Sequence, residues 1–586
     1  MNRNEVVLKR STNDRFISCL NCEYCLLQRT GRKPQWDLNK ELTHYRWVGY
    51  TGSDTSMQML KGWLNECVIE HHACNASTEP EKPTRLLDLG GVGVTGSIRL
   101  VPGVEASSQC YATLSYCWGS EKALLLTKSN IHAFEHNIEF DLLPKTFQDA
   151  VFICRKLDIT YLWIDALCII QGADGDWNDE ASRMGSVYAG SIITLAAEQA
   201  ESSRDGLLHH RSPLRQQDCR ILHSATHTII ASANSFCYEP GCGPGKCRLD
   251  TRGWVLQERL LSPRTAYFGP NGIHWECRWG ALCENQPFFL EKPGIFDDRH
   301  QESQIKGAHE AFYTLQDLRS RPDDLLRFQT SWTYLLEVYS LTDLTFASDR
   351  LVAIAGITSV FQSRLTLQAS FGLWLPFFTT ELLWTTDQAT WKDSRHSRRK
   401  IDYAPTWSWV SVSGVKIRNG WARLADKEDR FKQDLVKVEK LPAPTAFGHA
   451  DSLPPVGSPE LTIRLRGQLR RCFGTAESYK DGIMRFAYPV RENDGGHEFH
   501  TGELALDTTL VSETPLFCLL IARRTDYHIE YTDHMDVGLA LTPIDLSANL
   551  YRRIGYFSQS VRSKDPLNEQ GGFFTNSMPE SVVKII

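Results

Sequence analysis

The middle of the chain places hydrophobic and polar residues in a pattern typical of alternating strands and helices. Residues 110–117 (CYATLSYC) are short and rich in β-prone side chains, which predicts a strand. A helix is predicted from Pro144, because apolar residues then recur at helical spacing from Phe147 to Leu157. The run YLWID at residues 161–165 is short, apolar and ends in an acid, which favours a buried parallel strand.

The alternation continues toward the C-terminus. Apolar positions within residues 177–188 predict a second helix, and SIITLA at 191–196 predicts a third strand. Strands joined by helices indicate a parallel sheet with right-handed crossovers. Residues 254–261 predict a further helix, and 264–268 with 273–277 predict a hairpin joined by Gly-Pro-Asn-Gly.

Composition narrows the class of protein. The 586 residues allow two to four domains at roughly 100–200 residues each. A net charge of −6 argues against a dedicated nucleic-acid binder, which would normally present a basic face. The first 16 residues lack the apolar core of a signal peptide, and no apolar run reaches the about 18 residues of a membrane helix. We therefore expect a cytoplasmic protein without a membrane span, whose cysteines are mainly reduced.

Candidate chemistry follows the ends of the predicted strands, where open parallel sheets bind their ligands. Residues 115–119 (Ser-Tyr-Cys-Trp-Gly) end the first strand and Asp165 ends the second. If these strands are neighbours, both segments line one crevice, with Gly119 allowing a sharp turn. A structural role is equally open from the residues alone: Ser115 and Asp165 would cap loops, and Trp118 would pack in the core.

A third segment, DTRGWVLQER at residues 250–259, combines a helix start with charged side chains. Thr251 is a candidate N-cap. Glu258 could act as a reactive carboxylate, but by residue type alone a glutamate on a helix is most often solvated or paired. Arg252 and Arg259 are the available partners.

Together these segments resemble the fungal heterokaryon-incompatibility (HET) domain family. Residues 110–119 resemble its first block, Leu-Ser-Tyr-x-Trp-Gly, 143–195 its second, and 251–262 its third, Arg-Gly-Trp-x-Leu-Gln-Glu-Arg. Their order and spacing both fit the family. The resemblance implies a role in self/non-self recognition and in the cell death that follows fusion of unlike fungal cells, a form of innate immunity. It also implies self-association, or association with another incompatibility protein, as the partner.

HET domains in turn resemble, more distantly, Toll/interleukin-receptor (TIR) domains. That resemblance implies an α/β fold, a TIR/flavodoxin-like parallel sheet flanked by helices. It also implies that Glu258, in Trp-x-x-x-Glu spacing, is the catalytic residue of an NAD glycohydrolase, with NAD as substrate and no bound cofactor. A nearby carboxylate would stabilise the positive charge that develops on the ribose. The residues expected to shape the pocket are Ser115, Tyr116, Trp118, Gly119, Asp165, Arg252 and Trp254.

Two other functions remain open at this point. The domain could be a non-enzymatic, self-assembling signalling module, so catalysis is not decided by the sequence. A cysteine hydrolase is the second, because Cys117 and Cys168 follow the two key strands, although neither has a histidine partner nearby in sequence.

A structural zinc site is also conceivable. The tetrahedral set would be drawn from two groups near the N-terminus. Neither group repeats a known zinc-finger spacing, so buried thiols are favoured and no residue is assigned as a metal ligand. The two groups are Cys19, Cys22 and Cys25, and Cys67, His71, His72 and Cys74.

Linker-like composition predicts four parts along the chain. An N-terminal lead (1–82) precedes the HET domain (83–290), whose core motifs are those named above. A long C-terminal region of mixed α+β character follows, helical and mixed over 291–440 and β-leaning over 460–586.

Overall fold

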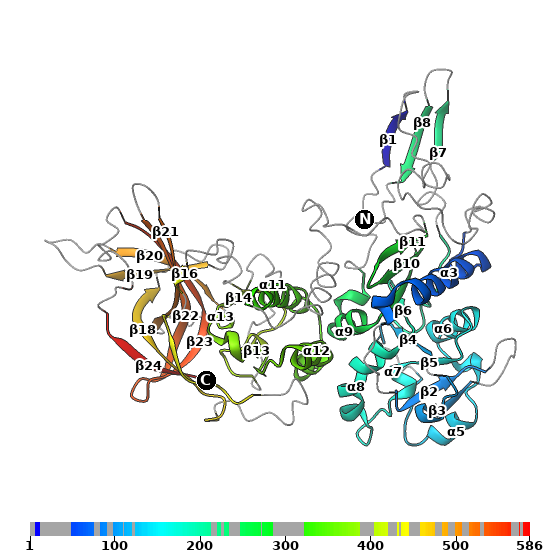
Figure 1. Ribbon diagram of the computed structural model, residues 1–586, viewed down its shortest axis with the longest axis horizontal. Coiled ribbons are helices and arrows are strands. Elements are labelled where there is room, and N and C mark those ends of the chain that lie inside the picture. Colours follow the sequence, from blue (N-terminus) through cyan, green and yellow to red (C-terminus); the bar gives the residue numbers. More distant parts are fainter. Residues whose placement is uncertain are drawn as a thin grey trace. The chain divides into compact units, whose positions relative to one another are not determined.

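The computed structural model divides the chain into two compact units, residues 1–309 and 310–586 (Figure 1). The finer division into four parts stays a prediction. The structure describes residues 6–11, 49–75, 82–90, 98–108, 110–119, 124–211, 219–223, 228–233, 247–270, 272–284, 322–386, 404–419, 431–432, 435–444, 458–474, 483–489, 499–506, 515–527, 532–563, 574 and 578–586.

An eight-stranded sheet forms the centre of the first unit, in the order β11-β10-β9-β6-β4-β5-β2-β3. The four central strands, from β9 to β5, are parallel, and antiparallel hairpins extend both edges. The strands are β2 (Arg85–Asp88), β3 (Arg99–Pro102), β4 (Tyr111–Ser115), β5 (Tyr161–Trp163), β6 (Ile193–Ala197), β9 (Arg264–Gly269), β10 (Gly272–Cys277) and β11 (Gly280–Cys283).

The predicted fold class is confirmed, with one refinement. Every residue of β4, β5 and β6 is buried, as expected for parallel strands covered on both faces. The hairpin predicted near residues 264–277 is also present, as β9 and β10. The sheet as a whole is mixed rather than parallel, because the hairpins at its two edges run antiparallel to their neighbours.

Strand order defines a topological switch point. Among the parallel strands, the chain runs from β4 to β5 on one side, then returns past β4 to β6 and on to β9. This is the flavodoxin-like order, and ligands of such sheets bind beyond the carboxyl ends of the strands where the direction reverses. Here the reversal lies at β4, the strand that ends at Ser115.

Helices cover both faces of this sheet. Right-handed crossovers in opposite directions place α6 (Lys145–Lys156) on one face and α8 (Trp177–Gly190) on the other. The crossover from β6 to β9, which contains α9 (Gly253–Leu261), runs in the same direction as the one that contains α8, and α9 packs against α8. Helix α3 (Asp54–Glu70) packs against α6 (Figure 1).

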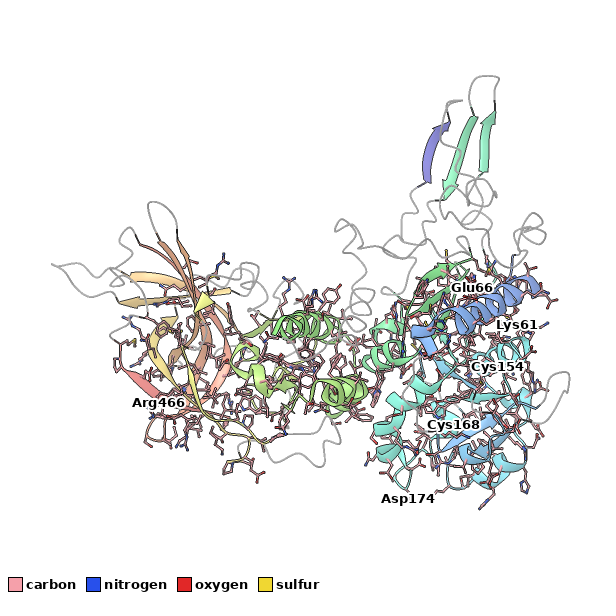
Figure 2. The ribbon with its side chains drawn as sticks, viewed as in Figure 1. Lys61, Glu66, Cys154, Cys168, Asp174 and Arg466 are labelled. Carbon is pink, nitrogen blue, oxygen red and sulfur yellow. The ribbon has the colours of Figure 1, made fainter. Side chains whose placement is uncertain are left out.

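The packing of α3 on α6 shows how the N-terminal segment joins the domain. Ser53 caps α3 by accepting a hydrogen bond from the backbone N–H of Ser56. Lys61 of α3 forms an ion pair with Asp158, just beyond α6, and Cys154 of α6 is fully buried below (Figure 2). The described segment 49–75 is therefore part of the first unit, through both apolar and charged contacts.

Smaller elements complete the first unit. Helices α4 (His72–Asn75), α5 (Ile131–His136) and α7 (Asp165–Cys168) are short. A separate antiparallel sheet, β1-β8-β7, is formed by β1 (Val6–Ser11), β7 (Cys219–His223) and β8 (Thr228–Ala233).

The second unit begins with helices and ends in a large, mainly antiparallel sheet, in which only β23 and β24 pair in parallel among the described strands. Helices α11 (Pro322–Tyr339), α12 (Ala355–Leu365) and α13 (Phe378–Glu381) surround buried aromatic side chains such as Trp332 and Trp374. Two small hairpins lie among them, made by β12 (Ala369–Ser370) with β13 (Leu373–Trp374) and by β14 (Trp384–Thr386) with β15 (Ile417–Asn419).

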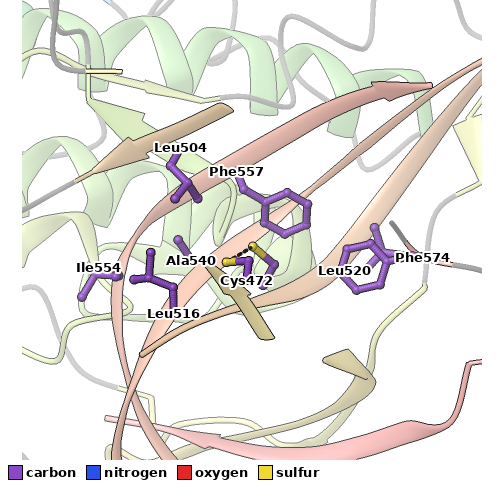
Figure 3. Packing of buried hydrophobic residues seen from close by; sticks show 9 residues of the cluster. Cys472, Leu504, Leu516, Leu520, Ala540, Ile554, Phe557 and Phe574 are labelled. Atoms are coloured by element: carbon purple, nitrogen blue, oxygen red, sulfur yellow. Dashed lines mark hydrogen bonds between the residues drawn. The ribbon is translucent and has the colours of Figure 1, made fainter. Parts of the chain in front are cut away.

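The large sheet gives the C-terminal segment the β character that its sequence predicts. In the strand order β16-β21-β22-β23-β20-β19-β18-β17, β18 pairs with β21 as well as with β19, so the second strand from each end is also joined to the other. Phe557, Leu504 and Cys518 lie in a buried cluster on it (Figure 3). Its strands are β16 (Phe431–Lys432), β17 (Lys437–Lys440), β18 (Ile463–Gly474), β19 (Ile483–Pro489), β20 (Phe499–Leu506), β21 (Leu516–Tyr527), β22 (Thr532–Asp545), β23 (Leu550–Ser563) and β24 (Glu580–Ile585).

Candidate functional site

The chain leaves β4 at the switch point through a turn that only glycine fits. Gly119 has a φ of +77°, a left-handed conformation, and a Cβ added there would lie 2.6 Å from the Cβ of Ser202. The predicted sharp turn is therefore present. Ser115 and Tyr116 are buried, whereas Trp118 is half-buried and Gly119 is exposed, so this segment runs from the core to the surface.

Asp165 lies at the end of the neighbouring strand, as the sequence predicts, and holds Trp118. The indole Nε1 of Trp118 donates to Asp165 Oδ2 at 2.7 Å, and the backbone N–H of Ala166 donates to Oδ1 at 2.7 Å. Burial raises the pKa of Asp165, and the hydrogen bond from Trp118 opposes that rise. The two segments predicted to meet thus share a direct hydrogen bond.

Helix α9 brings the third predicted segment to the same place. Arg252 is the residue preceding the helix, and its guanidinium donates to the backbone carbonyl of Tyr116. Thr251, predicted as the N-cap, instead lies in a 3₁₀ turn and donates its hydroxyl to the carbonyl of Arg248. That prediction is wrong, because the helix begins at Gly253 and its N-cap residue is Arg252.

Glu258 is the buried acid at the centre of these contacts, with 4% of its surface exposed. Burial raises its pKa from 4.5 to about 7, although the charge of Arg252 and the Ser115 hydroxyl both oppose the rise. Its Oε2 atom makes no hydrogen bond. A buried polar atom without a partner is costly, and such atoms often mark a catalytic or ligand-binding role.

The site has an inner and an outer layer. Ser115 and Glu258 are buried, while Trp118, Asp165 and Arg252 are each half-buried. The ring contact of Trp254, another residue predicted for the site, is with a neighbouring helix and not with these residues. Trp254 is 9% exposed and packs edge-on against Trp177 of α8, with ring centroids 5.7 Å apart. Its observed contact therefore fastens α9 to α8.

Two buried residues near the switch point were missed by the sequence analysis as site residues. Tyr188 of α8 donates its hydroxyl to the carbonyl of Leu114 at 3.1 Å and lies close enough to Glu258 to oppose the rise of its pKa. Glu198 directly follows β6, and burial raises its pKa to about 7. The sequence could have indicated Glu198 as a site residue, because it follows an apolar strand just as Asp165 does.

A second buried charge cluster uses the next residue of the same helix. Arg259 Nε donates to Glu276 Oε2 at 2.8 Å, and the Tyr267 hydroxyl donates to the same oxygen at 2.8 Å. Asp250 lies 3.8 Å from Arg259. Arg259 thus pairs with Glu276 and Asp250, whereas the positive charge that acts on Glu258 is that of Arg252.

The cysteines near the site do not suit nucleophilic catalysis. Burial raises the pKa of Cys117, and it raises the pKa of Cys168 to about 12 (Figure 2). A reactive thiol needs the opposite shift. Among the described residues, Cys283 is disulfide-bonded and ten other cysteines are free, which agrees with thiols that are mainly reduced. The candidate zinc ligands Cys19, Cys22 and Cys25 lie outside the described residues.

Comparison with known proteins identifies the region that holds the site. Residues 111–258 match the family model described as heterokaryon incompatibility protein (HET). No match is found among curated proteins or solved structures. Among the residues that the structure describes, no helix is long and apolar enough to cross a membrane. The matched region begins at β4 and ends at Glu258, and so contains every candidate site residue.

Proposed function

We propose, from the match of residues 111–258 to the HET family model, that this chain is an effector of fungal self/non-self recognition that triggers cell death by cleaving NAD at Glu258. The observation that carries the proposal is the Oε2 atom of Glu258, which is buried at the topological switch point without a hydrogen bond. A carboxylate held this way can respond to a developing positive charge more strongly than one in water.

The reaction would be hydrolysis of the bond between nicotinamide and ribose. The bonding electron pair leaves with the nicotinamide nitrogen, which becomes neutral, and the ribose C1′ gains positive charge. Glu258 as a carboxylate stabilises this charge. A water oxygen then attacks C1′, and its proton passes to Glu258, whose pKa of about 7 suits both accepting and releasing a proton near neutral pH.

Other site residues would orient the carboxylate and the substrate. Arg252 keeps part of the Glu258 population ionised, because its positive charge lowers the pKa of that carboxyl. Trp118, half-buried and held by Asp165, would offer an aromatic face to the nicotinamide ring.

The test is release of nicotinamide from NAD by the purified full chain, measured at low concentration and after clustering by an antibody. We expect Glu258→Gln to lower turnover by about 10²–10⁴-fold, the usual contribution of a positioned acid–base group. Glu381→Gln is the matched control, because Glu381 of the second unit is also a buried acid with a raised pKa, here of about 8. It should leave turnover unchanged.

Two outcomes would contradict the proposal. Full turnover by folded Glu258→Gln protein would remove the catalytic role of this residue. Absence of turnover by the wild type in both conditions would reject NAD cleavage and favour the non-enzymatic signalling module, which sedimentation at increasing concentration would then examine.

A further inference from the structure

We propose that Cys67, His71, Cys74 and Cys277 form a zinc site that fastens the segment before the HET domain to the edge of its sheet. One ligand atom from each residue lies within 4.8 Å of all the others. All four side chains are buried, with at most 4% of their surface exposed. Three thiols and an imidazole with these separations form one of the common ligand sets of structural zinc.

Local structure at the end of α3 gathers three of the ligands. Cys67 lies in the last turn, and His71 follows the helix with its backbone N–H donating to the carbonyl of Cys67 at 3.2 Å. The short helix α4 then turns back, because the N–H of Cys74 donates to the carbonyl of His71 at 2.9 Å. Helix and turn together therefore direct the three side chains toward one point.

The fourth ligand comes from a part of the first unit that is distant in sequence. Cys277 is the last residue of β10, directly before the turn into β11. Its Sγ lies 3.7 Å from Nδ1 of His71. Ligand atoms of a tetrahedral zinc site, at about 2.3 Å for sulfur and 2.0–2.1 Å for nitrogen, lie roughly 3.5–3.8 Å apart. The observed separation matches that range.

The surroundings suit a metal site better than they suit packed thiols. Three thiolates around Zn²⁺ leave a net charge of −1, and the Arg264 guanidinium donates to the Cys67 sulfur at 3.2 Å, where it balances that charge. The ring of Trp279 stacks on His71, with centroids 5.1 Å apart and an interplanar angle of 15°, which fixes the imidazole orientation. Cys67, Cys74 and Cys277 are free of disulfides.

Soft ligands also select the metal. Thiolates with one imidazole favour zinc over magnesium, calcium or manganese, which prefer oxygen. The sequence favoured buried thiols here and drew its possible ligands from residues 19–25 and 67–74, of which His72 is exposed. Cys277 was not considered, because it is remote in the chain and carries no zinc-finger spacing.

The consequence is a folded domain that extends beyond the matched family region. Three ligands precede residue 111 and the fourth follows residue 258. Zinc would therefore close the fold around the matched region, joining α3 and α4 to β10. The binding free energy of a structural metal adds to folding stability.

The experiment measures metal bound to the full chain, purified under reducing conditions without chelator. We expect about one zinc per chain in the wild type, as for a single tetrahedral site. Cys277→Ser should lower zinc affinity by at least about 10–100-fold, the scale of a perturbed metal site. Cys154→Ser is the matched control, because Cys154 is a fully buried, free cysteine of the same unit outside the cluster, and it should keep its zinc.

A second measurement covers the case in which Cys277→Ser does not fold. Cobalt exchanged into the wild type should give the intense visible absorption of tetrahedral thiolate coordination. His71→Cys should retain the metal and shift this absorption to longer wavelength. Wild-type protein without zinc that takes up no cobalt would overturn the proposal, as would a Cys67–Cys74 disulfide found by mass spectrometry in the protein purified under the same conditions.

Discussion

Neighbouring residues of α9 enter two buried charge clusters whose carboxylates differ in how completely they are hydrogen-bonded. Arg259 meets Glu276, which also accepts a hydrogen bond from Tyr267. Glu258 faces Arg252 and the Ser115 hydroxyl, yet its Oε2 makes no hydrogen bond and its pKa rises to about 7. Both acids are buried to a similar degree, with 7% of Glu276 and 4% of Glu258 exposed.

This comparison distinguishes a buried acid that stabilises the fold from one that is proposed to react. A buried acid that accepts hydrogen bonds from two partners is stabilised as an anion and contributes mainly to the fold. A buried acid with an unpaired oxygen costs folding free energy, and proteins tend to retain such groups where they bind or react. Glu276 fits the first description and Glu258 fits the second, although α9 brings both clusters to one part of the unit.

The largest expected effect comes from breaking the paired cluster. Glu276→Gln should lower the free energy of unfolding by about 3–5 kcal/mol, because Arg259 would keep a buried charge without its main partner. Urea unfolding followed by tryptophan fluorescence measures this. Glu258→Gln in the same assay should destabilise much less. Equal losses in both variants would show that the two clusters do not differ.

The next effect is a pH dependence that belongs to Glu258. Because its pKa is raised to about 7 in the folded protein, folding favours the protonated form. The stability that this group contributes is fully present below about pH 4.5 and is lost as pH rises through about 7, a change of up to about 3 kcal/mol. Unfolding free energies of wild type and Glu258→Gln, measured at pH 5 and pH 8, report it.

The relevant quantity is the difference between the two proteins at each pH. The wild type should lose stability relative to Glu258→Gln as pH rises. Glu198, whose pKa is also raised to about 7, is present in both proteins and cancels in this difference. A difference that does not change with pH would mean that Glu258 is not held in a strongly desolvated site.

The smallest effect concerns the hydrogen bond between Trp118 and Asp165. Trp118→Phe keeps an aromatic ring but removes the Nε1 donor, and should cost about 1–2 kcal/mol of unfolding free energy. A double-mutant cycle with Asp165→Asn isolates the pair. A coupling energy near zero would show that the outer layer of the site is not held by this bond.

Local patterns predicted much of the α/β core. The apolar runs at β4, β5 and β6 are buried on both faces of the sheet, so their sequences are continuous in hydrophobicity and easily recognised. The edge strands β2 and β3 were not predicted, because they are only four residues long and partly exposed. Helix α3 was also not predicted, although it packs directly against α6 of the first unit.

Some features of the candidate site could likewise be predicted from the sequence, and others could not. The sequence by itself determined that a serine and an aspartate end two buried strands and that Glu258 lies on a helix, since these follow from local apolar spacing and motif order. Only the tertiary structure decided which arginine serves Glu258, where Trp254 packs, and that Cys277 meets Cys67. The last two pairings join residues far apart in the chain, and the geometry of all three depends on how the helices and edge hairpins pack on the sheet, which no local pattern records.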